Sequence, residues 1–431
     1  MTASIPSELM TPRQDAVAKL LLLTARVEFT DAHAARAKEL AAQVTDWDCY
    51  IDTSAKKFSI TYSYRHLKAY ASELVPELAM SRMRRLAKHS GITSLKIAAA
   101  QITFHKTCIA PLDVRYVYMK GVALSQQFDR EIADRFSRDV DILVEEKSFR
   151  RVVLSAVEHG YQLMLDQEPL EFAATRQDVA FIARHAEVAT LIGSDGVHIE
   201  VHRRLGKLGL KFDLNDILNN AEHVELLGTR IKTIPKATHF IYICSHHSRH
   251  FWSRLHWLAD LNAMATAFQN DRDEIIQKAE IIGIGPTISA AFEFNELAPH
   301  PDQWDLTETA PAGGQQFLKA CLINLNGGLE IEQELRTKLA LGDFMADWQV
   351  SNTRHSSLWR NTWGRRLRPN IQQYKKRRLP AALHWAYYLE NASQLWTNVL
   401  NRFLGRSSAT SKSHRFANTP VQAAESKDST T

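Results

Sequence analysis

The stretch Arg135-Phe136-Ser137-Arg138-Asp139-Val140-Asp141-Ile142-Leu143-Val144 decides the fold of this 431-residue chain. Its second half has the apolar character of a buried β-strand, but it carries two carboxylates at spacing i, i+2. Successive side chains of a strand point to opposite faces, so Asp139 and Asp141 share one face. Two like charges side by side are costly to bury unless a cation compensates them, and a divalent metal ion is the usual solution. The stretch therefore predicts a strand with a metal-binding face.

A glycine turn precedes this strand in the sequence. Residues 114–119 form a further predicted strand, which is followed at once by Lys120-Gly121 and by a helix-like segment at 122–128. A residue without Cβ lets the chain approach a phosphate, and the N-terminus of the following helix offers free N–H groups. Lys120 can reach the same phosphates as a point charge. Lys120 and Gly121 are therefore candidate nucleotide-binding residues.

A third acid follows the strand. Residues 187–192 and 197–202 flank Ser194-Asp195-Gly196, and Asp-Gly between two apolar runs predicts a β-hairpin. The hairpin places Glu200 on the same sheet as the Asp-x-Asp pair. A strand, a glycine turn and a helix, then an Asp-x-Asp strand and a strand with a third acid, form the plan of a metal-dependent nucleotidyl transfer site.

The chemistry of nucleotidyl transfer explains why three acids are needed. Two divalent cations about 4 Å apart can stabilise the attacking and the leaving oxygens, and carboxylates hold them in place. Mg²⁺ prefers oxygen ligands and keeps several waters, so three carboxylates and the triphosphate oxygens suffice. We therefore expect Asp139, Asp141 and Glu200 to be catalytic and to bind two Mg²⁺ ions. The alternative is that these acids decorate a solvated edge of the sheet.

This order of elements resembles the polymerase-beta-like nucleotidyltransferase superfamily and, within it, the large bacterial family of uncharacterised nucleotidyltransferases. Four segments carry the resemblance: residues 119–124, 135–144, 199–205 and 246–260. Most of the superfamily has Gly-Ser or Gly-Gly at the turn, whereas Val122 follows the glycine here. The resemblance implies an α+β fold, in which a small mixed-sheet palm lies between mainly helical N- and C-terminal regions.

Two arginines and a histidine near the acids are further candidates for nucleotide binding. The arginine fork suits phosphate oxygens, so Arg135 and Arg138 could hold the triphosphate, or they could neutralise the neighbouring aspartates. His202 shares a strand face with Glu200, where it could position the acceptor or act as a base. A purely structural role for His202 is equally compatible with the sequence.

The helical block at residues 246–260 contributes two more candidates through the resemblance. His247 and Asp260 resemble recurrent positions of the family, where this region is thought to close over the nucleotide. Asp260 could instead pair with Arg254 or His256 within its own helix.

Helical periodicity surrounds the predicted palm. We expect a helical N-terminal domain at 1–111, the palm at 112–235, a helical C-terminal region at 236–406 and a disordered tail at 407–431. The tail is rich in Ser, Thr, Lys and Ala and has almost no large apolar residue.

The composition is that of an ordinary soluble globular protein, with 45% hydrophobic and 23% charged residues. No apolar run approaches the roughly 18–20 residues of a membrane span. The four cysteines are widely scattered and include no C-x-x-C pair, which argues against a disulfide framework or a zinc cluster. We expect a cytoplasmic protein.

The net charge of +5 is unevenly distributed. Residues 354–415 contain many Arg and Lys but a single acid, Glu390, and tryptophans are interleaved at 359, 363, 385 and 396. Such a basic, aromatic-rich end could face nucleic acid, anionic lipid or an acidic partner. It could also be a solvated helical face with its tryptophans in the core.

Together these features predict a Mg²⁺-dependent nucleotidyltransferase. It would move a nucleoside monophosphate from an NTP, with ATP the favoured donor, to an acceptor hydroxyl on a small molecule or a protein. No template nucleic acid is expected, because no nucleic-acid module accompanies the palm. Two alternatives compete: a nucleotide-binding protein that has lost turnover, and a protein that binds nucleic acid or an anionic membrane through its basic C-terminal region.

Overall fold

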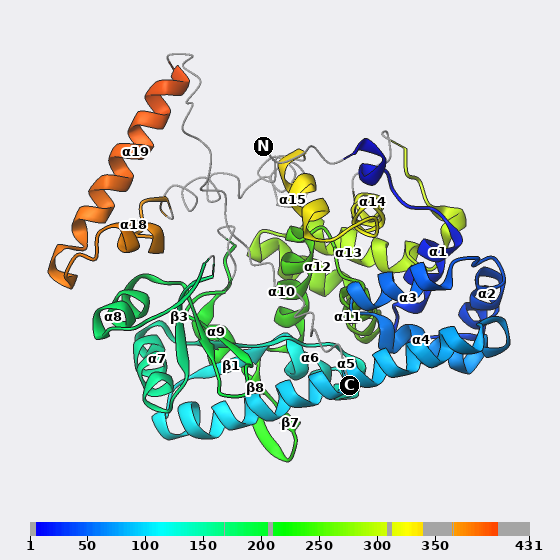
Figure 1. Ribbon diagram of the computed structural model, residues 1–431, viewed down its shortest axis with the longest axis horizontal. Coiled ribbons are helices and arrows are strands. Elements are labelled where there is room, and N and C mark those ends of the chain that lie inside the picture. The colour runs from blue at the N-terminus through cyan, green and yellow to red at the C-terminus, as the bar shows by residue number, and fades with distance from the viewer. Residues whose placement is uncertain are drawn as a thin grey trace, which may run out of the picture. The chain divides into compact units, whose positions relative to one another are not determined.

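The computed structural model describes residues 6–167, 169–205, 210–307, 313–338, 364 and 366–403. Contacts divide the chain into two compact units, Met1–Leu163 with Ala186–Thr362 and Met164–His185 with Trp363–Thr431. An eight-stranded mixed sheet is preceded and followed by helices, which confirms the predicted α+β class (Figure 1). The predicted disordered tail lies outside the described residues, and the predicted domain boundaries stay predictions.

The N-terminal part of the first unit is helical, as predicted. Asp15 caps the first helix by accepting a hydrogen bond from the Ala18 N–H at 2.8 Å. The helices are α1 (Ala16–Thr24), α2 (Asp31–Ala41), α3 (Trp47–Lys56), α4 (Ile60–Tyr70) and α5 (Glu77–Phe104).

Helix α5 is a single helix of 28 residues that reaches from the N-terminal helices to the sheet (Figure 1). Gly91 lies in its interior, and a Cβ there would come within 3.2 Å of the Ala133 Cβ. The glycine therefore lets the turn at Ile132–Asp134 pack closely against α5. Ser94 then donates a hydrogen bond of 2.7 Å to the carbonyl oxygen of Arg135. In this way α5 holds the segment that leads into the Asp-x-Asp strand.

The sheet places the three predicted strands side by side. Its strands are β1 (Tyr116–Met119), β2 (Asp139–Val144), β3 (Gln162–Gln167), β4 (Leu170–Phe172), β5 (Val188–Ile192), β6 (His198–His202), β7 (Glu222–Leu226) and β8 (Thr229–Thr233). Their order is β4-β3-β5-β6-β2-β1-β8-β7. Strand β2 is antiparallel to β1 and parallel to β6, and β5 and β6 form the predicted hairpin.

Helices of the first unit cover the sheet and continue beyond it. Helix α6 (Gly121–Gln127) begins directly after β1, and α7 (Phe149–Glu158) follows β2. Gly160 adopts a φ of 85° just after α7, as expected of a residue that ends a helix. The later helices are α9 (Leu214–Asn219), α10 (Lys236–Arg249), α11 (His256–Ala267), α12 (Arg272–Ile282), α13 (Gly285–Leu297), α14 (Gly314–Asn324) and α15 (Leu329–Lys338).

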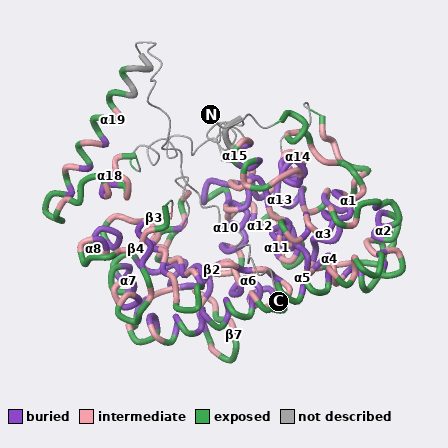
Figure 2. The backbone as a smooth tube through the Cα atoms, viewed as in Figure 1, coloured by how far each residue is buried: buried purple, intermediate pink, exposed green. Residues whose placement is uncertain are grey.

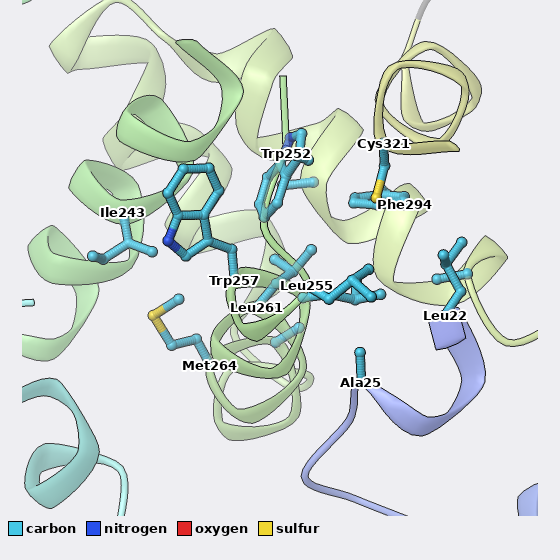
Figure 3. Close-up of a cluster of buried hydrophobic side chains, with 14 of the residues drawn as sticks. Leu22, Ala25, Ile243, Trp252, Leu255, Trp257, Leu261, Met264, Phe294 and Cys321 are labelled. Carbon is cyan, nitrogen blue, oxygen red and sulfur yellow. The ribbon is translucent and has the colours of Figure 1, made fainter. Parts of the chain in front are cut away.

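One hydrophobic core joins the N-terminal helices to the helices that follow the sheet. Leu22 of α1 belongs to the same cluster as Trp252, Leu255 and Phe294 (Figure 3). Figure 2 marks most of α10 and α11 as buried. Each fully buried large apolar side chain contributes about 1.5–3 kcal/mol. This shared core fixes the helices around the sheet and therefore around the candidate site.

The second unit contains α8 (Arg176–His185), α18 (Ile371–Lys376) and α19 (Trp385–Phe403). Tyr374 donates a hydrogen bond of 2.8 Å to the buried carboxylate of Asp178. Trp385 and Trp396 are 58% and 67% exposed. The expectation of a tryptophan core at this end is therefore wrong for these two, while Trp359 and Trp363 lie outside the described residues. No helix in the described part of the chain is both long and apolar enough to cross a bilayer.

Candidate active site

Three acids, a lysine and a histidine gather where β1, β2 and β6 lie side by side, and we call Asp139, Asp141, Glu200, Lys120 and His202 the acid cluster. The parallel register of β2 and β6 pairs Asp141 directly with Glu200. Side chains of paired residues lie on the same face of a sheet. One ligand atom each of Asp141, Glu200 and His202 lies within 4.8 Å of the others. This group of three could hold a metal ion.

Two basic groups neutralise part of the acid cluster. Lys120 Nζ lies 2.8 Å from Asp141 Oδ1, and His202 Nε2 lies 2.9 Å from the same oxygen. His202 Nε2 is also 3.4 Å from Glu200 Oε2. Burial alone would raise the pKa of Asp141, but Lys120 and His202 lower it below its usual value. Asp141 is thus a carboxylate at neutral pH although it is 4% exposed.

Asp139 lies on the same face of β2, but it stands outside the group that could share one ion. Residues two apart on a strand are separated by about 6.6 Å. The two aspartate side chains would therefore have to move before one ion could contact both. Burial and the charges of Asp141 and Glu200 raise the pKa of Asp139 to about 6. Three carboxylates thus face one lysine and one histidine. This excess of negative charge and the oxygen-rich donor set fit Mg²⁺.

The turn between β1 and α6 is strained and carefully supported. Lys120 has a φ of 56°, which is unusual for a residue with a Cβ. Its backbone N–H donates to His239 Nε2 at 3.0 Å, and His239 Nδ1 donates to Gln127 Oε1 at 2.6 Å. Burial and the nearby Arg135 lower the pKa of His239 to about 3, so its imidazole is neutral and can accept. His239 was not predicted, because a histidine on a buried helix gives no sequence signal.

Gly121 is the residue that this turn needs. Its φ is 48°, and a Cβ there would lie 3.5 Å from the Asp139 carbonyl oxygen. The turn therefore brings the N-terminus of α6 close to the start of β2. Phosphate contact by Lys120 and Gly121 stays a prediction, and in this structure the Lys120 ammonium contacts Asp141 instead.

A second set of charges lies deeper in the first unit, and we call Arg130, Arg135 and Asp260 the Asp260 cluster. Arg135 holds the Asp260 carboxylate with two parallel hydrogen bonds of 2.8 and 2.9 Å. Arg130 donates a third hydrogen bond of 2.7 Å. Asp260 is fully buried and Arg135 is 4% exposed. The two arginines and the other contacts lower the pKa of Asp260 despite its burial.

The Asp260 cluster contains residues predicted to bind nucleotide, but here they are buried and contact one another. Asp260 pairs with arginines from the loop before β2, so the alternative that it pairs with Arg254 or His256 is wrong. His247 is also buried, and its Nε2 lies 3.7 Å from Asp260, too far for a hydrogen bond. Nucleotide contact by Arg135, His247 and Asp260 stays a prediction. Their burial and their mutual contacts favour a role in positioning the loop that carries Asp139.

Arg138 has yet another setting. It is half-buried, and its guanidinium lies over the ring of Phe58, 5.5 Å from the ring centroid. Its charge acts on Asp139, where it partly offsets the two other carboxylates. Among the predicted arginines it is therefore the one whose side chain lies at the acid cluster.

Residues 43–297, more than half of the chain, match the family described as "Uncharacterised nucleotidyltransferase". This range includes β1, β2 and β6, and so the whole acid cluster. No curated protein and no solved structure matched the chain. The match and the predicted resemblance agree, and the chain therefore belongs to the uncharacterised nucleotidyltransferase family and is a nucleotidyltransferase enzyme.

Proposed function

We propose that the protein is a Mg²⁺-dependent enzyme that moves a nucleoside monophosphate from an NTP to an acceptor hydroxyl and releases pyrophosphate. ATP is the favoured donor, and the acceptor is a small molecule or a protein. One observation carries this proposal: Asp141 and Glu200 converge with His202, and Asp139 lies beside them on the same sheet face. A glycine turn followed by a helix N-terminus lies next to these acids.

The acids are the proposed metal ligands. Asp139, Asp141 and Glu200 would hold two Mg²⁺ ions, which supply positive charge to the attacking oxygen and to the leaving pyrophosphate. Asp139 supports this assignment, because burial and the two other carboxylates outweigh the cations near it and raise its pKa, and a cation that binds beside it would stabilise its charge.

Lys120 and His202 would change partners during the reaction. Lys120 now contacts Asp141, and neutralisation of that carboxylate by another cation would free its ammonium for the phosphate oxygens of the donor. Asp141 and Glu200 raise the pKa of His202, so its Nε2 donates to them now. Neutralisation of these carboxylates by cations would free the imidazole to take up a proton from the acceptor hydroxyl.

A labelling experiment tests the proposed reaction. The wild-type protein is incubated with each α-labelled NTP, Mg²⁺ and cell extract, and it is compared with Asp141→Asn and with Glu158→Gln. Glu158 is an exposed acid on α7 and serves as the matched control. We expect label on an acceptor with the wild type and the control, and none with Asp141→Asn.

The same experiment separates the alternatives. Equal labelling by wild type and Asp141→Asn would refute the metal-dependent mechanism. Nucleotide binding without metal-dependent release of pyrophosphate would instead identify a protein that has lost turnover.

A further inference from the structure

Two arginines from distant segments lie over one aromatic ring beside the acid cluster. The guanidinium carbons of Arg138 and Arg254 are each 5.5 Å from the centroid of the Phe58 ring. Arg138 precedes β2, Arg254 lies just before α11, and Phe58 follows α3. We call Arg138 and Arg254 the arginine pair.

The arginine pair lacks the counter-ions that other arginines of this unit have. Within the described ranges, no carboxylate lies within ion-pair distance of either guanidinium, whereas Arg130 and Arg135 share the buried Asp260. Burial and the charge of Arg138 lower the pKa of Arg254 to about 10, so the Arg254 guanidinium stays charged at neutral pH. Asp139 and Glu332 act on Arg254 only from beyond ion-pair distance. Two half-buried like charges without a described carboxylate in direct contact form a place where an oxyanion can bind.

The aromatic support of the pair is rigid. Phe58 stacks on Phe136 with the ring centroids 4.5 Å apart and the planes 3° from parallel. Arg254 also lies over Trp257, 5.1 Å from the ring centroid. These contacts restrict how far each guanidinium can swing, and a pre-organised fork loses less entropy when it binds.

The end of α3 determines where the Phe58 ring lies. The φ of Phe58 is 61°, a left-handed conformation that costs an aromatic residue about 1–3 kcal/mol. The hydrogen bonds from the Phe58 N–H to Ala55 O and from the Ser59 N–H to Ser54 O hold the chain in this shape. These are the two hydrogen bonds of a Schellman C-cap, so the end of α3 fixes the position of the Phe58 ring.

The pair is adjacent to the acids. Arg138 and Arg254 both act electrostatically on Asp139. Lys120, by contrast, contacts Asp141, the other aspartate of the strand. The acid cluster is therefore flanked by fixed positive charge next to each of its two aspartates.

We propose that the arginine pair, on its Phe58 support, is an oxyanion-binding subsite that takes a phosphate or carboxylate group of a substrate. Guanidinium forks bind both groups through paired, charge-assisted hydrogen bonds. The inference rests on the proposed function, because the acid cluster places the reacting atoms next to the pair. The oxyanion has two possible sources, the polyphosphate of the donor nucleotide and an anionic group on the acceptor.

Isothermal titration calorimetry of the full chain in EDTA tests the subsite. EDTA removes divalent metal ions, which would otherwise bind to the acids and attract phosphate there. The probes are inorganic pyrophosphate alone and inorganic phosphate in the presence of saturating ATP. The proteins are wild type, Arg254→Gln, Arg254→Lys and Arg150→Gln, where Arg150 is an exposed arginine on α7 and serves as control. Arg254→Lys keeps the charge but not the fork, so it guards against a loss caused by misfolding.

Each outcome decides between the sources or overturns the proposal. Pyrophosphate affinity reduced about tenfold or more in Arg254→Gln, partly restored in Arg254→Lys and unchanged in Arg150→Gln, assigns the subsite to the donor polyphosphate. The same pattern for phosphate bound alongside ATP assigns it to the acceptor. Equal affinities of all four proteins for both probes would overturn the subsite.

The test also separates this inference from the proposed function. Asp141→Asn removes a proposed metal ligand but leaves the arginine pair intact, so its oxyanion binding in EDTA should equal that of the wild type. Labelling that persists in Asp141→Asn would therefore refute the metal mechanism and leave the binding result standing. Because the substitution also releases Lys120 from Asp141, somewhat tighter oxyanion binding than in the wild type is equally consistent with the subsite. Loss of oxyanion binding in Asp141→Asn would count against a subsite made by the arginines.

Discussion

The acid cluster and the Asp260 cluster are both charged regions of the same unit, but only in the Asp260 cluster do all the charged groups have ion-pair partners supplied by the fold. Asp260 is fully buried and receives three hydrogen bonds from two arginines. The acid cluster is partly exposed, and its three carboxylates face one lysine and one histidine. A buried charge is stable when the fold supplies its ion-pair and hydrogen-bond partners. Carboxylates without enough such partners are stabilised by a cation bound from solution. The comparison separates residues that build the site from residues that act in it.

The segment between Arg130 and Asp139 links the two regions. Its arginines fix it to α11, and Ser94 of α5 holds the Arg135 carbonyl. The Asp260 cluster therefore supports the start of β2, where the acid cluster begins. Substitutions in the Asp260 cluster should reduce stability, and substitutions in the acid cluster should reduce activity.

The largest expected effect is on stability, in the Asp260 cluster. Asp260→Asn leaves two buried guanidiniums without a counter-ion, so we expect the free energy of unfolding to fall by about 3–5 kcal/mol. Urea unfolding followed by circular dichroism measures this change. Asp302→Asn, at an exposed acid, is the matched control and should change little. A loss below about 1 kcal/mol in Asp260→Asn would contradict the structural role of this cluster.

Acid should weaken the same region. Burial lowers the pKa of His247, next to Asp260, from its usual 6.5 to about 4. The folded state therefore binds fewer protons than the unfolded state between these values, and stability is lost as the pH falls through them. We expect His247 to account for about 2 kcal/mol of the loss between pH 8 and pH 5.

Unfolding of wild type and His247→Gln at these two pH values isolates this contribution. The variant is expected to lose less stability on acidification, because glutamine does not titrate. Parallel losses in both proteins would show that other groups cause the acid sensitivity.

A smaller effect of opposite sign is expected in the acid cluster. The pKa of Asp139 is raised to about 6, so its charge destabilises the folded protein, and stability is lost as the pH rises from about 4 to 6. Asp139→Asn should therefore stabilise the metal-free protein at pH 8 by about 1–2 kcal/mol, after allowance for the partial exposure of the side chain. It should also abolish nucleotidyl transfer.

Denaturation of both proteins in EDTA at pH 8 and pH 4 checks this prediction. Near pH 4 the gain should vanish, because the wild-type carboxyl is then protonated. A variant that is less stable than wild type at pH 8 would show that Asp139 is a structural residue.

The acid cluster and the Asp260 cluster also differ in how far they could be predicted from the sequence. The strands, the hairpin and the face shared by Asp139 and Asp141 follow from local patterns of alternation and turn residues, and the structure has them as predicted. The family and the α+β class follow from the order of those elements. Local pattern was sufficient wherever the relevant residues lie on one strand or on two strands joined by a hairpin.

Long-range pairing was the part that local pattern could not predict. Arg130 and Asp260 are 130 positions apart, and His239 supports Lys120 from 119 positions away. Neither pair has a sequence spacing that would single it out among the many possible pairs of charged or polar residues in the chain. The left-handed backbone of Phe58 at the end of α3 cannot be predicted from hydrophobic periodicity.

The smallest expected effect is the change in stability when Mg²⁺ binds to the acid cluster. A ligand that binds the folded state stabilises it by an amount set by its concentration, about 1.4 kcal/mol at ten times its dissociation constant. Mg²⁺ at that excess should raise the melting temperature of the wild type and of Glu158→Gln, and should have no effect on Asp141→Asn. The Asp260 cluster has its counter-ions built in, so Arg130→Lys should lose stability and yet keep the full Mg²⁺ shift. Thermal melts with and without Mg²⁺ measure both effects. An equal Mg²⁺ shift in Asp141→Asn and wild type would mean that the ion binds elsewhere, and the unbalanced charge of the acid cluster would then need another partner.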